Sequence, residues 1–186
     1  HSIDIDPFGS PVYFFDAAVK SVYNKGIIAC TATDTAALCG VFPQVCFRRY
    51  AAWPLHGPSM HEIGLRILLG CLCREAAKYE RGIEPVLCYT TDHYVRLYVQ
   101  IHNGKSTANA SMAQYSIIPA KDVPLSQDST ALVGPLWLGN IQKKTAIQEI
   151  RTLASTKMLN TKHLLWKFLD LLEEEADAPP FFYTIN

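Results

Sequence analysis

Residues 2–33, SIDIDPFGSPVYFFDAAVKSVYNKGIIACTAT, decide the fold of this chain. Ser2 to Asp6 has the length of a short strand, and Ile27 to Thr33 is a continuous apolar run typical of a strand buried on both faces. The apolar side chains between these segments fall at helical spacings of 3, 4 and 3 residues, namely Val12, Phe15, Val19 and Val22. A strand, a helix and a second strand in this order predict a β-α-β unit with parallel strands.

Capping signals predict where the first two long helices begin. Ser10 precedes Pro11; a serine hydroxyl can accept a hydrogen bond from a free amide, and proline suits the first helical position. Ser59 and Glu62 form a capping box, which predicts the start of a long helix. Gly82 is predicted to end that helix, because glycine readily adopts the left-handed conformation found after many helices.

The middle of the chain predicts loops and a hairpin. Thr35 to Gly57 contains several Gly and Pro residues, which predict a loop with one helical turn at Cys46 to Tyr50. Ile83 to Tyr89 and Tyr94 to Ile101 predict two strands joined by a tight turn. His102 to about Asp128 is polar and low in aromatic residues, which predicts a boundary or a mobile connection.

The last third of the chain predicts a second, mainly helical unit. Gly134 to Gly139 is a compact apolar segment, and helices are predicted near Lys144 to Ala154 and from Thr161 to Glu175. The last helix is expected to bury Leu164, Leu165, Phe168, Leu171 and Leu172. Strands that alternate with helices in this way predict an α/β protein.

Composition excludes several classes of protein. The chain has 186 residues, of which 49% are hydrophobic and 18% are charged, so it is not disordered, collagenous or coiled-coil. This length suits one domain, or one domain plus part of another. The 17 basic and 17 acidic residues cancel, so any binding to nucleic acid has to come from local patches.

The six cysteines are expected to be reduced and buried. The closest pair is Cys71 and Cys73, which on a helix point roughly 200° apart and make a poor zinc site. No metal is therefore expected. The apolar runs are shorter than the ~20 residues that a membrane span needs, so we expect a soluble intracellular protein with no membrane partner.

The residues with the clearest chemistry are Asp6, Pro7, Phe8 and Gly9, at the carboxyl end of the first strand, where ligands bind in open α/β sheets. The Asp6 carboxylate and the Pro7 carbonyl can accept the two N–H bonds of an exocyclic amino group, whose lone pair is delocalised into the base. Phe8 can stack on an extracted base, and Gly9 allows a sharp backbone exit. The alternative is an ordinary strand-to-helix turn.

Five blocks of sequence, spread over nearly the whole chain, are specific in combination. They are DIDPFGSP at Asp4 to Pro11, TATDTAALCG at Thr31 to Gly40, HEIGLR at His61 to Arg66, GIEPVLCYTTDHYVRL at Gly82 to Leu97, and GPLWLG at Gly134 to Gly139. In this order they closely resemble the tRNA guanine-26 N(2)-dimethyltransferases of archaea and eukaryotes.

That resemblance implies a fold and a division into domains. Residues 1–103 would be the back half of a class I S-adenosylmethionine-dependent methyltransferase, with a doubly wound, mainly parallel sheet that ends in an antiparallel hairpin. Residues 104–186 would be part of an α+β C-terminal domain that binds tRNA. The chain would begin on the fourth strand of the sheet, which leaves that strand with an unpaired, hydrophobic edge.

The resemblance also implies an activity. The family transfers methyl groups from S-adenosylmethionine to the exocyclic 2-amino group of guanine 26 in tRNA, giving N2-methylguanosine and N2,N2-dimethylguanosine. Asp6, Pro7, Phe8 and Gly9 would correspond to the amino-methylating motif, and Thr33, Asp34 and Thr35 would line the same crevice near the target base together with Phe8. The implied partner is tRNA, in the cytoplasm or, in a eukaryote, the nucleus; no protein partner is implied.

The chain departs from the family pattern in two places. It has no glycine-rich loop upstream of the motif, so most residues that bind the cofactor are expected to precede it. Some family members carry four cysteines after the hairpin as a zinc site, whereas His102 to Val133 has none. Two alternatives stay open: as an isolated chain, a tRNA-binding module without catalysis, or an amino-methyltransferase that acts on another base or RNA.

A second group of candidates lies in the loop-rich segment. Arg48, Arg49 and Tyr50, with Trp53 and His56 nearby, are residue types that contact RNA phosphates and stack on bases. The alternative is an ordinary solvated turn. The sequence alone favours neither interpretation.

Overall fold

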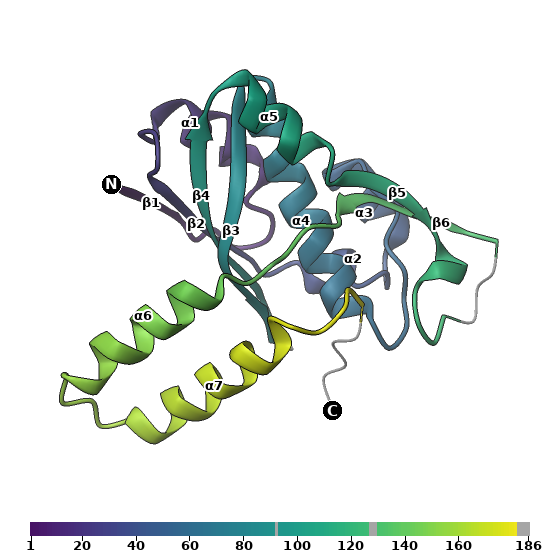
Figure 1. Cartoon of the computed structure of the whole chain (residues 1–186). Helices are drawn as coiled ribbons and strands as arrows, with labels where there is room; N and C mark the ends of the chain where they lie inside the picture. Colours follow the sequence, from purple (N-terminus) through teal and green to yellow (C-terminus); the bar gives the residue numbers. More distant parts are fainter. Residues whose placement is uncertain (92, 127–129, 182–186) are drawn as a thin grey trace.

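Four strands form a mixed sheet at the centre of the molecule (Figure 1). The structure is a computed structural model that describes residues 1–91, 93–126 and 130–181. The strands stand in the order β1 (Ser2–Ile5), β2 (Ile27–Ala32), β4 (Val95–Asn103) and β3 (Arg81–Thr90). β1 and β2 are parallel, which confirms the predicted β-α-β unit, and β4 runs antiparallel to both of its neighbours, which confirms the predicted hairpin. β1 lies at one edge, and no described strand pairs with its outer side.

The first helix begins differently from the prediction. A 3-10 turn, η1 (Val12–Phe14), comes before α1 (Phe15–Ser21), and Pro11 is its N-cap rather than its first residue. The Val12 amide donates to Ser10 Oγ at 3.4 Å, so Ser10 does satisfy a free amide. Phe15, Val19 and Val22 are buried as predicted, whereas Val12 is half-buried.

The segment predicted as a loop contains two helices. α2 (Thr35–Leu38) follows β2 directly, and α3 (Pro43–Tyr50) is longer than the single turn predicted at its end. Pro43 is the first residue of α3, where its missing N–H costs nothing. Both helices pack against α4 (Met60–Ala77), the long helix that follows.

The region predicted as a polar connection is also structured. It forms α5 (Lys105–Met112), β5 (Tyr115–Pro119) and the 3-10 turn η2 (Ala120–Asp122), while residues 127 and 128 lie outside the described residues. β5 pairs antiparallel with β6 (Leu132–Trp137) in a second, two-stranded sheet. This small sheet packs on α4 (Figure 1).

α5 covers the outer edge of β3. Ser111 Oγ accepts a hydrogen bond from the Ile83 amide at 2.9 Å and donates to the Ile83 carbonyl at 3.3 Å. Gly82 lies within β3 and does not end a helix, which corrects the prediction. A Cβ at this position would collide with the backbone carbonyl of Thr107, so glycine is what lets α5 approach the strand.

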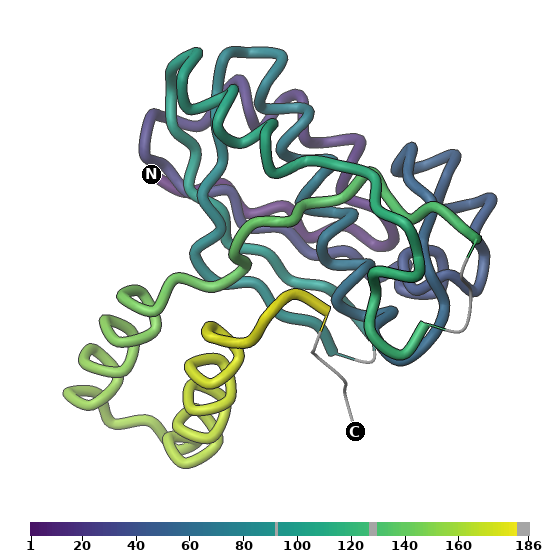
Figure 2. The backbone as a smooth tube through the Cα atoms, turned by 45° about the vertical axis from the view of Figure 1, so that its right-hand side comes forward, coloured from purple at the N-terminus to yellow at the C-terminus, as the bar shows by residue number. Residues whose placement is uncertain are grey.

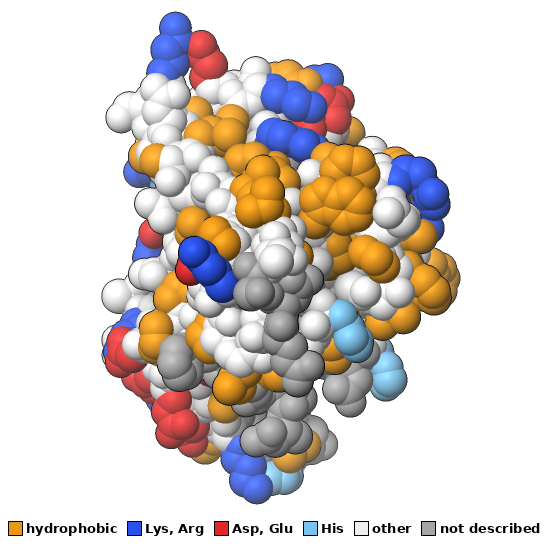
Figure 3. Space-filling model, turned by 90° about the vertical axis from the view of Figure 1, so that its right-hand side faces the viewer, with side chains coloured by type: hydrophobic (Ala, Val, Ile, Leu, Met, Phe, Trp, Pro, Cys, Tyr) orange, Lys and Arg blue, Asp and Glu red, His pale blue; other side chains and the backbone are white. Residues whose placement is uncertain are grey.

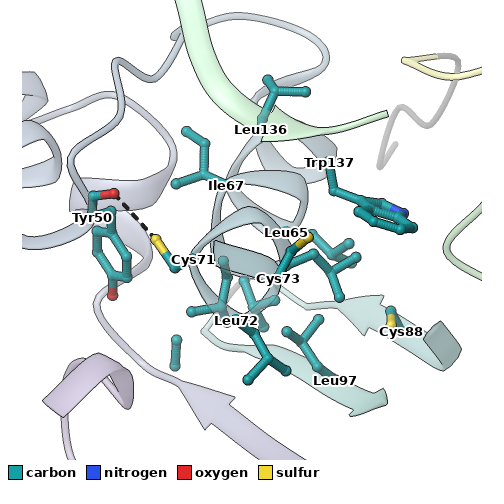
Figure 4. Close-up of a cluster of buried hydrophobic side chains, with 14 of the residues drawn as sticks. Tyr50, Leu65, Ile67, Cys71, Leu72, Cys73, Cys88, Leu97, Leu136 and Trp137 are labelled. Carbon is teal, nitrogen blue, oxygen red and sulfur yellow. Dashed lines mark hydrogen bonds between the residues drawn. The ribbon is translucent and has the colours of Figure 1, made fainter. Parts of the chain in front are cut away.

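α4 is buried on every side. Every residue from Glu62 to Cys73 is buried, which is typical of a helix that lies between other elements. Leu72 points toward Leu97 of β4, and Ile67 points toward Leu136 of β6 (Figure 4). The helix therefore joins the four-stranded sheet and the two-stranded sheet into one core.

All six cysteines are buried and free, as predicted. Cys71 Sγ donates to the Tyr50 carbonyl at 3.2 Å (Figure 4). Burial raises the pKa of Cys71, Cys73 and Cys88 to about 12. These thiols therefore stay protonated at neutral pH and fill the core rather than act as nucleophiles.

Ser59 and Glu62 do not form the predicted capping box, since no side chain caps α4. Ser59 Oγ instead donates to the Phe181 carbonyl at 3.0 Å, and the Phe181 amide donates to Glu62 Oε1 at 2.8 Å. Both side chains are therefore used to hold the last described residue of the chain against α4.

Glu62 also forms a buried ion pair with Arg66, one turn further along α4. Arg66 Nε donates to Glu62 Oε1 at 2.7 Å, and the two side chains are 2% and 1% exposed. Arg66 Nη1 donates to the carbonyls of Trp137 and Gly139 at 3.0 and 2.9 Å. One guanidinium thus connects α4 to the segment that leaves β6.

α6 (Lys144–Ser155) and α7 (Lys162–Glu175) form an antiparallel hairpin that stands apart from the rest (Figures 1 and 2). Both helices match the predicted ranges. Their own small core contains Ile147, Leu169 and Leu172, and it touches the sheet through Leu87 and Tyr89.

The buried face of α7 is rotated from the prediction. Leu164 and Leu171 are 55% and 51% exposed, while Leu169, which was not predicted, is buried beside Leu172. No described helix has the length and apolar character that crossing a bilayer requires.

Candidate functional site

The loops that follow β1 and β2 lie side by side, because the carboxyl ends of two parallel neighbouring strands meet at one edge of the sheet. The Gly9 amide donates to Thr33 Oγ1 at 2.7 Å, and the Thr33 amide donates to the Gly9 carbonyl at 2.9 Å. Two predicted site segments, 24 residues apart in sequence, are therefore fixed to each other by a reciprocal pair of hydrogen bonds.

Gly9 is required at this turn by its backbone conformation. Its φ is +84°, in the left-handed region that side chains disfavour, although a Cβ would meet no atom within 4 Å. The constraint at Gly9 is therefore strain and not space. The turn leaves Phe8 fully exposed and leads the chain back toward Thr33.

Asp6 and Phe8 are both available to a ligand. Asp6 is exposed, and no described residue forms a hydrogen bond or ion pair with its carboxylate. A free carboxylate can accept N–H bonds, and an aromatic ring exposed on both faces can stack on a base. The predicted catalytic turn thus presents an acceptor and a stacking surface at one strand end.

Asp34 has a different environment. Tyr50 Oη donates to one carboxylate oxygen at 2.6 Å, and Arg49 Nη1 donates to the other at 3.0 Å. The Asp34 backbone carbonyl accepts from the amides of Ala37 and Leu38, which start α2 above Thr35. Because both carboxylate oxygens are engaged, Asp34 holds the loop after β2 in place against α3.

We call Asp34 with its two partners, Arg49 and Tyr50, the Asp34 clamp. The pKa shifts of the two partners are consistent with a fixed carboxylate. Burial, followed by the charge of Asp34, raises the pKa of Tyr50 well above its ordinary value. The hydrogen bond to Asp34 raises the pKa of Arg49. Tyr50 therefore remains a neutral donor and Arg49 a cation at any physiological pH.

The four predicted tRNA contacts are not equivalent. Arg48 is exposed, and Arg49 forms an ion pair with Asp34 while its side chain stays 36% exposed. His56 is exposed, and its Nδ1 lies 3.0 Å from the Cys39 carbonyl oxygen. Tyr50 is fully buried, so it touches the Asp34 carboxylate and presents no surface to RNA. Sequence reasoning missed this clamp, because its partners are 16 residues apart and belong to different elements.

A hollow of about 530 Å³ opens beside the edge strand. Ile3, Ile5 and Phe14 supply apolar walls, and Asp6 and Pro7 also line it. S-adenosylmethionine has a flat adenine ring, a polar ribose and a cationic sulfur, so apolar side chains beside a carboxylate fit part of such a molecule. In the described part of the chain, no three His, Cys, Asp or Glu side chains gather closely enough to hold a metal ion.

Comparison with known proteins shows the family of this chain. The family model for N2,N2-dimethylguanosine tRNA methyltransferase matches residues 1–186. The chain belongs to this family. This match confirms the family that the five sequence blocks resemble.

Two curated relatives illustrate the match. The tRNA (guanine(26)-N(2))-dimethyltransferase of Thermococcus kodakarensis is 41% identical over 189 residues, covering 98% of this chain and 50% of that protein. The enzyme of the same name from Pyrococcus abyssi is 38% identical, covering 99% of this chain and 51% of that protein. The chain therefore spans about half the length of the curated relatives it matches.

A solved structure confirms the fold of this family member. The complex of Trm1 from Pyrococcus horikoshii with S-adenosyl-L-methionine superposes with a TM-score of 0.86 at 37% identity, covering 96% of this chain and 50% of that chain. The chain is thus an α/β protein with the fold of half of a class I methyltransferase. The strand order and the hairpin agree with the fold class predicted from the sequence.

The Asp34 clamp in this dimethyltransferase-family chain is expected to contribute to stability. Tyr50→Phe removes one buried hydrogen bond and should lower the free energy of unfolding of the full-length protein by about 1 kcal/mol. Asp34→Ala should cost more, about 2–3 kcal/mol, because it removes the charged acceptor of the buried Tyr50 hydroxyl. Chemical denaturation measures both values.

Tyr23→Phe is the matched control for the Asp34 clamp, since Tyr23 is 69% exposed and no described residue forms a hydrogen bond with its hydroxyl. It should change the free energy of unfolding by less than about 0.5 kcal/mol. If Tyr50→Phe were as neutral as Tyr23→Phe, the hydrogen bond to Asp34 would make no net contribution to stability.

Proposed function

We propose that the full-length protein transfers methyl groups from S-adenosylmethionine to the exocyclic 2-amino group of a guanine in tRNA, at the position corresponding to 26. The observation that carries this proposal is the Asp6–Gly9 turn, which exposes Asp6 and Phe8 and is fixed to Thr33 at the shared carboxyl ends of β1 and β2, in a chain of this family. The names of the curated relatives support the same activity.

In this proposal the residues of the turn prepare the amino group. The nitrogen is a weak nucleophile because its lone pair is delocalised into the base. The Asp6 carboxylate and the Pro7 carbonyl accept its two N–H bonds, which favours a tetrahedral nitrogen with a localised lone pair. S-adenosylmethionine, when bound, would supply the methyl group: its S–CH3 bond breaks as the N–CH3 bond forms, the sulfur leaves as a neutral thioether, and the displaced N–H proton would pass to the Asp6 carboxylate.

The neighbouring residues position the base. Phe8 stacks on the base that leaves the tRNA helix, and its full exposure makes both faces of the ring accessible. Thr33 holds the turn through its hydrogen bonds to Gly9, and Asp34 holds the adjoining loop. Thr33, Asp34 and Thr35 thereby form the second wall of the proposed base site. Because tRNA is the proposed substrate, we also propose that the protein acts inside the cell.

A substrate that lacks only the reacting amine tests this function. A tRNA transcript with inosine in place of the target guanine keeps the shape of the base but has no 2-amino group. The full-length protein should transfer labelled methyl groups from S-adenosylmethionine to the guanine transcript and none above background to the inosine transcript. Filter binding should give similar affinities for the two transcripts.

The control is a transcript with inosine at a guanine elsewhere in the tRNA, which should be methylated normally. Equal methylation of all three transcripts would show that a different atom of the RNA accepts the methyl group. If ribosomal RNA or DNA were methylated faster than the target-guanine transcript, the activity would be assigned to that nucleic acid instead of tRNA.

A further inference from the structure

Aromatic side chains crowd the surface around α3. Phe42, Phe47 and Trp53 are 56%, 45% and 36% exposed, although such large apolar side chains are usually buried. The rings of Phe47 and Trp53 stack on each other, with centroids 4.4 Å apart and an angle of 15° between the planes. Figure 3 views this side of the molecule and shows a broad area of hydrophobic side chains with histidines at its margin.

The stretch of chain that carries these rings has charged side chains of one sign. Residues 35–61 contain Arg48, Arg49, His56 and His61 and no Asp or Glu. Arg48 and Arg49 lie in the last turn of α3, directly after Phe47. The Asp34 carboxylate pairs with Arg49 and leaves Arg48 free, and exposed planar rings beside a free arginine are complementary to unpaired bases and their phosphates. We call Phe42, Phe47, Arg48, Arg49 and Trp53 the α3 surface.

The α3 surface is rigid where it carries its largest ring. The Trp53 amide donates to the Gly134 carbonyl at 2.8 Å, and the Gly134 amide donates back to the Trp53 carbonyl at 2.8 Å. Trp53 is thereby fixed to β6, and Phe47 is fixed by the helix. Binding to preorganised rings costs little conformational entropy.

The α3 surface also adjoins the candidate site. Arg49 Nη1 lies 3.0 Å from Asp34 Oδ2, so the last turn of α3 contacts the loop that follows β2. An RNA strand whose target base enters at Phe8 therefore has its neighbouring nucleotides within reach of α3.

We propose that the α3 surface binds tRNA nucleotides adjacent to the target guanine, with Phe47 and Trp53 stacking on an unpaired base and Arg48 contacting a phosphate. This inference rests on the proposed function. In this proposal Trp53 and Phe47 act in binding, and methyl transfer is left to the Asp6–Gly9 turn.

Three variants of the full-length protein test the α3 surface. Phe47→Ala and Trp53→Ala should each raise the Kd for the unmodified tRNA and its KM on the order of 10- to 100-fold, the range for loss of base stacking, with kcat changed only a few-fold. Trp53→Phe should recover most of the affinity. Arg48→Gln should weaken binding and reduce the slope of log Kd against log salt concentration by about 0.7 to 0.9.

The matched control is Tyr23→Ala, which removes an exposed aromatic ring beside the amino end of β2 and should leave Kd and KM unchanged. Thermal unfolding distinguishes RNA from the alternative occupant of this surface, which is another part of the same polypeptide. If the Phe47 and Trp53 variants lower the Tm by several degrees and leave Kd unchanged, another part of the polypeptide covers these rings and the inference is wrong. Methylation that depends on the 2-amino group while Kd is unaffected would overturn this inference alone and leave the proposed function intact.

Discussion

Asp6→Ala in the full-length protein is expected to lower kcat for methyl transfer to tRNA by at least about 100-fold, the lower end of the range for loss of a proton-accepting group. Asp6 is the side-chain acceptor at the strand end, and no described residue competes for its carboxylate. Removing it leaves the amino group with the Pro7 carbonyl alone. Because the loss falls on the reacting atoms, Kd for tRNA should stay within a few-fold of its normal value.

Because Asp6 is exposed, a loss of activity in Asp6→Ala can be separated from a loss of folding. An exposed side chain without a protein partner can be removed with little effect on folding, so the Tm of Asp6→Ala should match that of the unaltered protein. Asp6→Asn keeps one oxygen acceptor and should retain more activity than Asp6→Ala. Asp170→Asn, which removes a surface carboxylate of α7 paired with Arg151, is the control and should be fully active. Normal kcat in Asp6→Ala would exclude Asp6 from the reaction.

Glu62→Ala is expected to destabilise the full-length protein by about 3–5 kcal/mol, the usual cost of leaving a buried charge without its partner. The Arg66 guanidinium would keep the carbonyls of Trp137 and Gly139 and the Phe181 ring but lose its carboxylate, and the Phe181 amide would lose its acceptor. Urea denaturation should show a clear fall in the midpoint. The effect is large because both side chains are almost completely buried.

Two comparisons isolate the contribution of the buried pair. The double variant Glu62→Leu with Arg66→Met removes both charges together and should be less destabilised than Glu62→Ala, because no buried charge is left unpaired. Lys78→Ala breaks the exposed pair with Glu75 and should cost less than about 1 kcal/mol. If Glu62→Ala cost no more than Lys78→Ala, the 2.7 Å contact with Arg66 would not be a stabilising one.

The predictable parts of this fold are those where hydrophobic periodicity meets a buried surface. β4 was predicted from its alternation, and Val95, Leu97, Val99 and Ile101 are all buried. α5 was missed because its sequence, KSTANASM, is polar and carries few strong helix-forming side chains. It is held by its contact with β3, which Gly82 makes possible, and that contact joins residues far apart in sequence.

Cap signals failed for a related reason. Ser59 and Glu62 have the spacing of a capping box, yet their partners come from Phe181, more than a hundred residues later. A local pattern predicts a local hydrogen bond, whereas a buried side chain bonds to whatever the tertiary structure brings near it. The face of α7 was misjudged similarly, since Leu164, Leu169 and Leu171 are chemically alike and only packing against α6 and β3 selects among them.

The candidate site likewise has parts that the sequence predicts and parts that only the folded chain reveals. The rule that ligands bind at the carboxyl ends of strands placed Asp6 to Gly9 at a ligand site, and the resemblance to the family placed Thr33 to Thr35 in the same crevice. The Asp34 clamp and the exposed Phe42 and Phe47 had no local signal, because exposure and long-range hydrogen bonds are properties of the folded chain.

The hairpin of α6 and α7 is attached to the body at both of its ends. Before α6, the Lys143 amide donates to the Val86 carbonyl of β3 at 3.0 Å; after α7, the Phe181 amide donates to Glu62 of α4 at 2.8 Å. A rigid arm pinned at two points keeps a single axis of rotation. Any movement of the hairpin relative to the sheet is therefore a swing about the line from β3 to α4, which shifts the hairpin core against Leu87 and Tyr89 while both pivots stay in place.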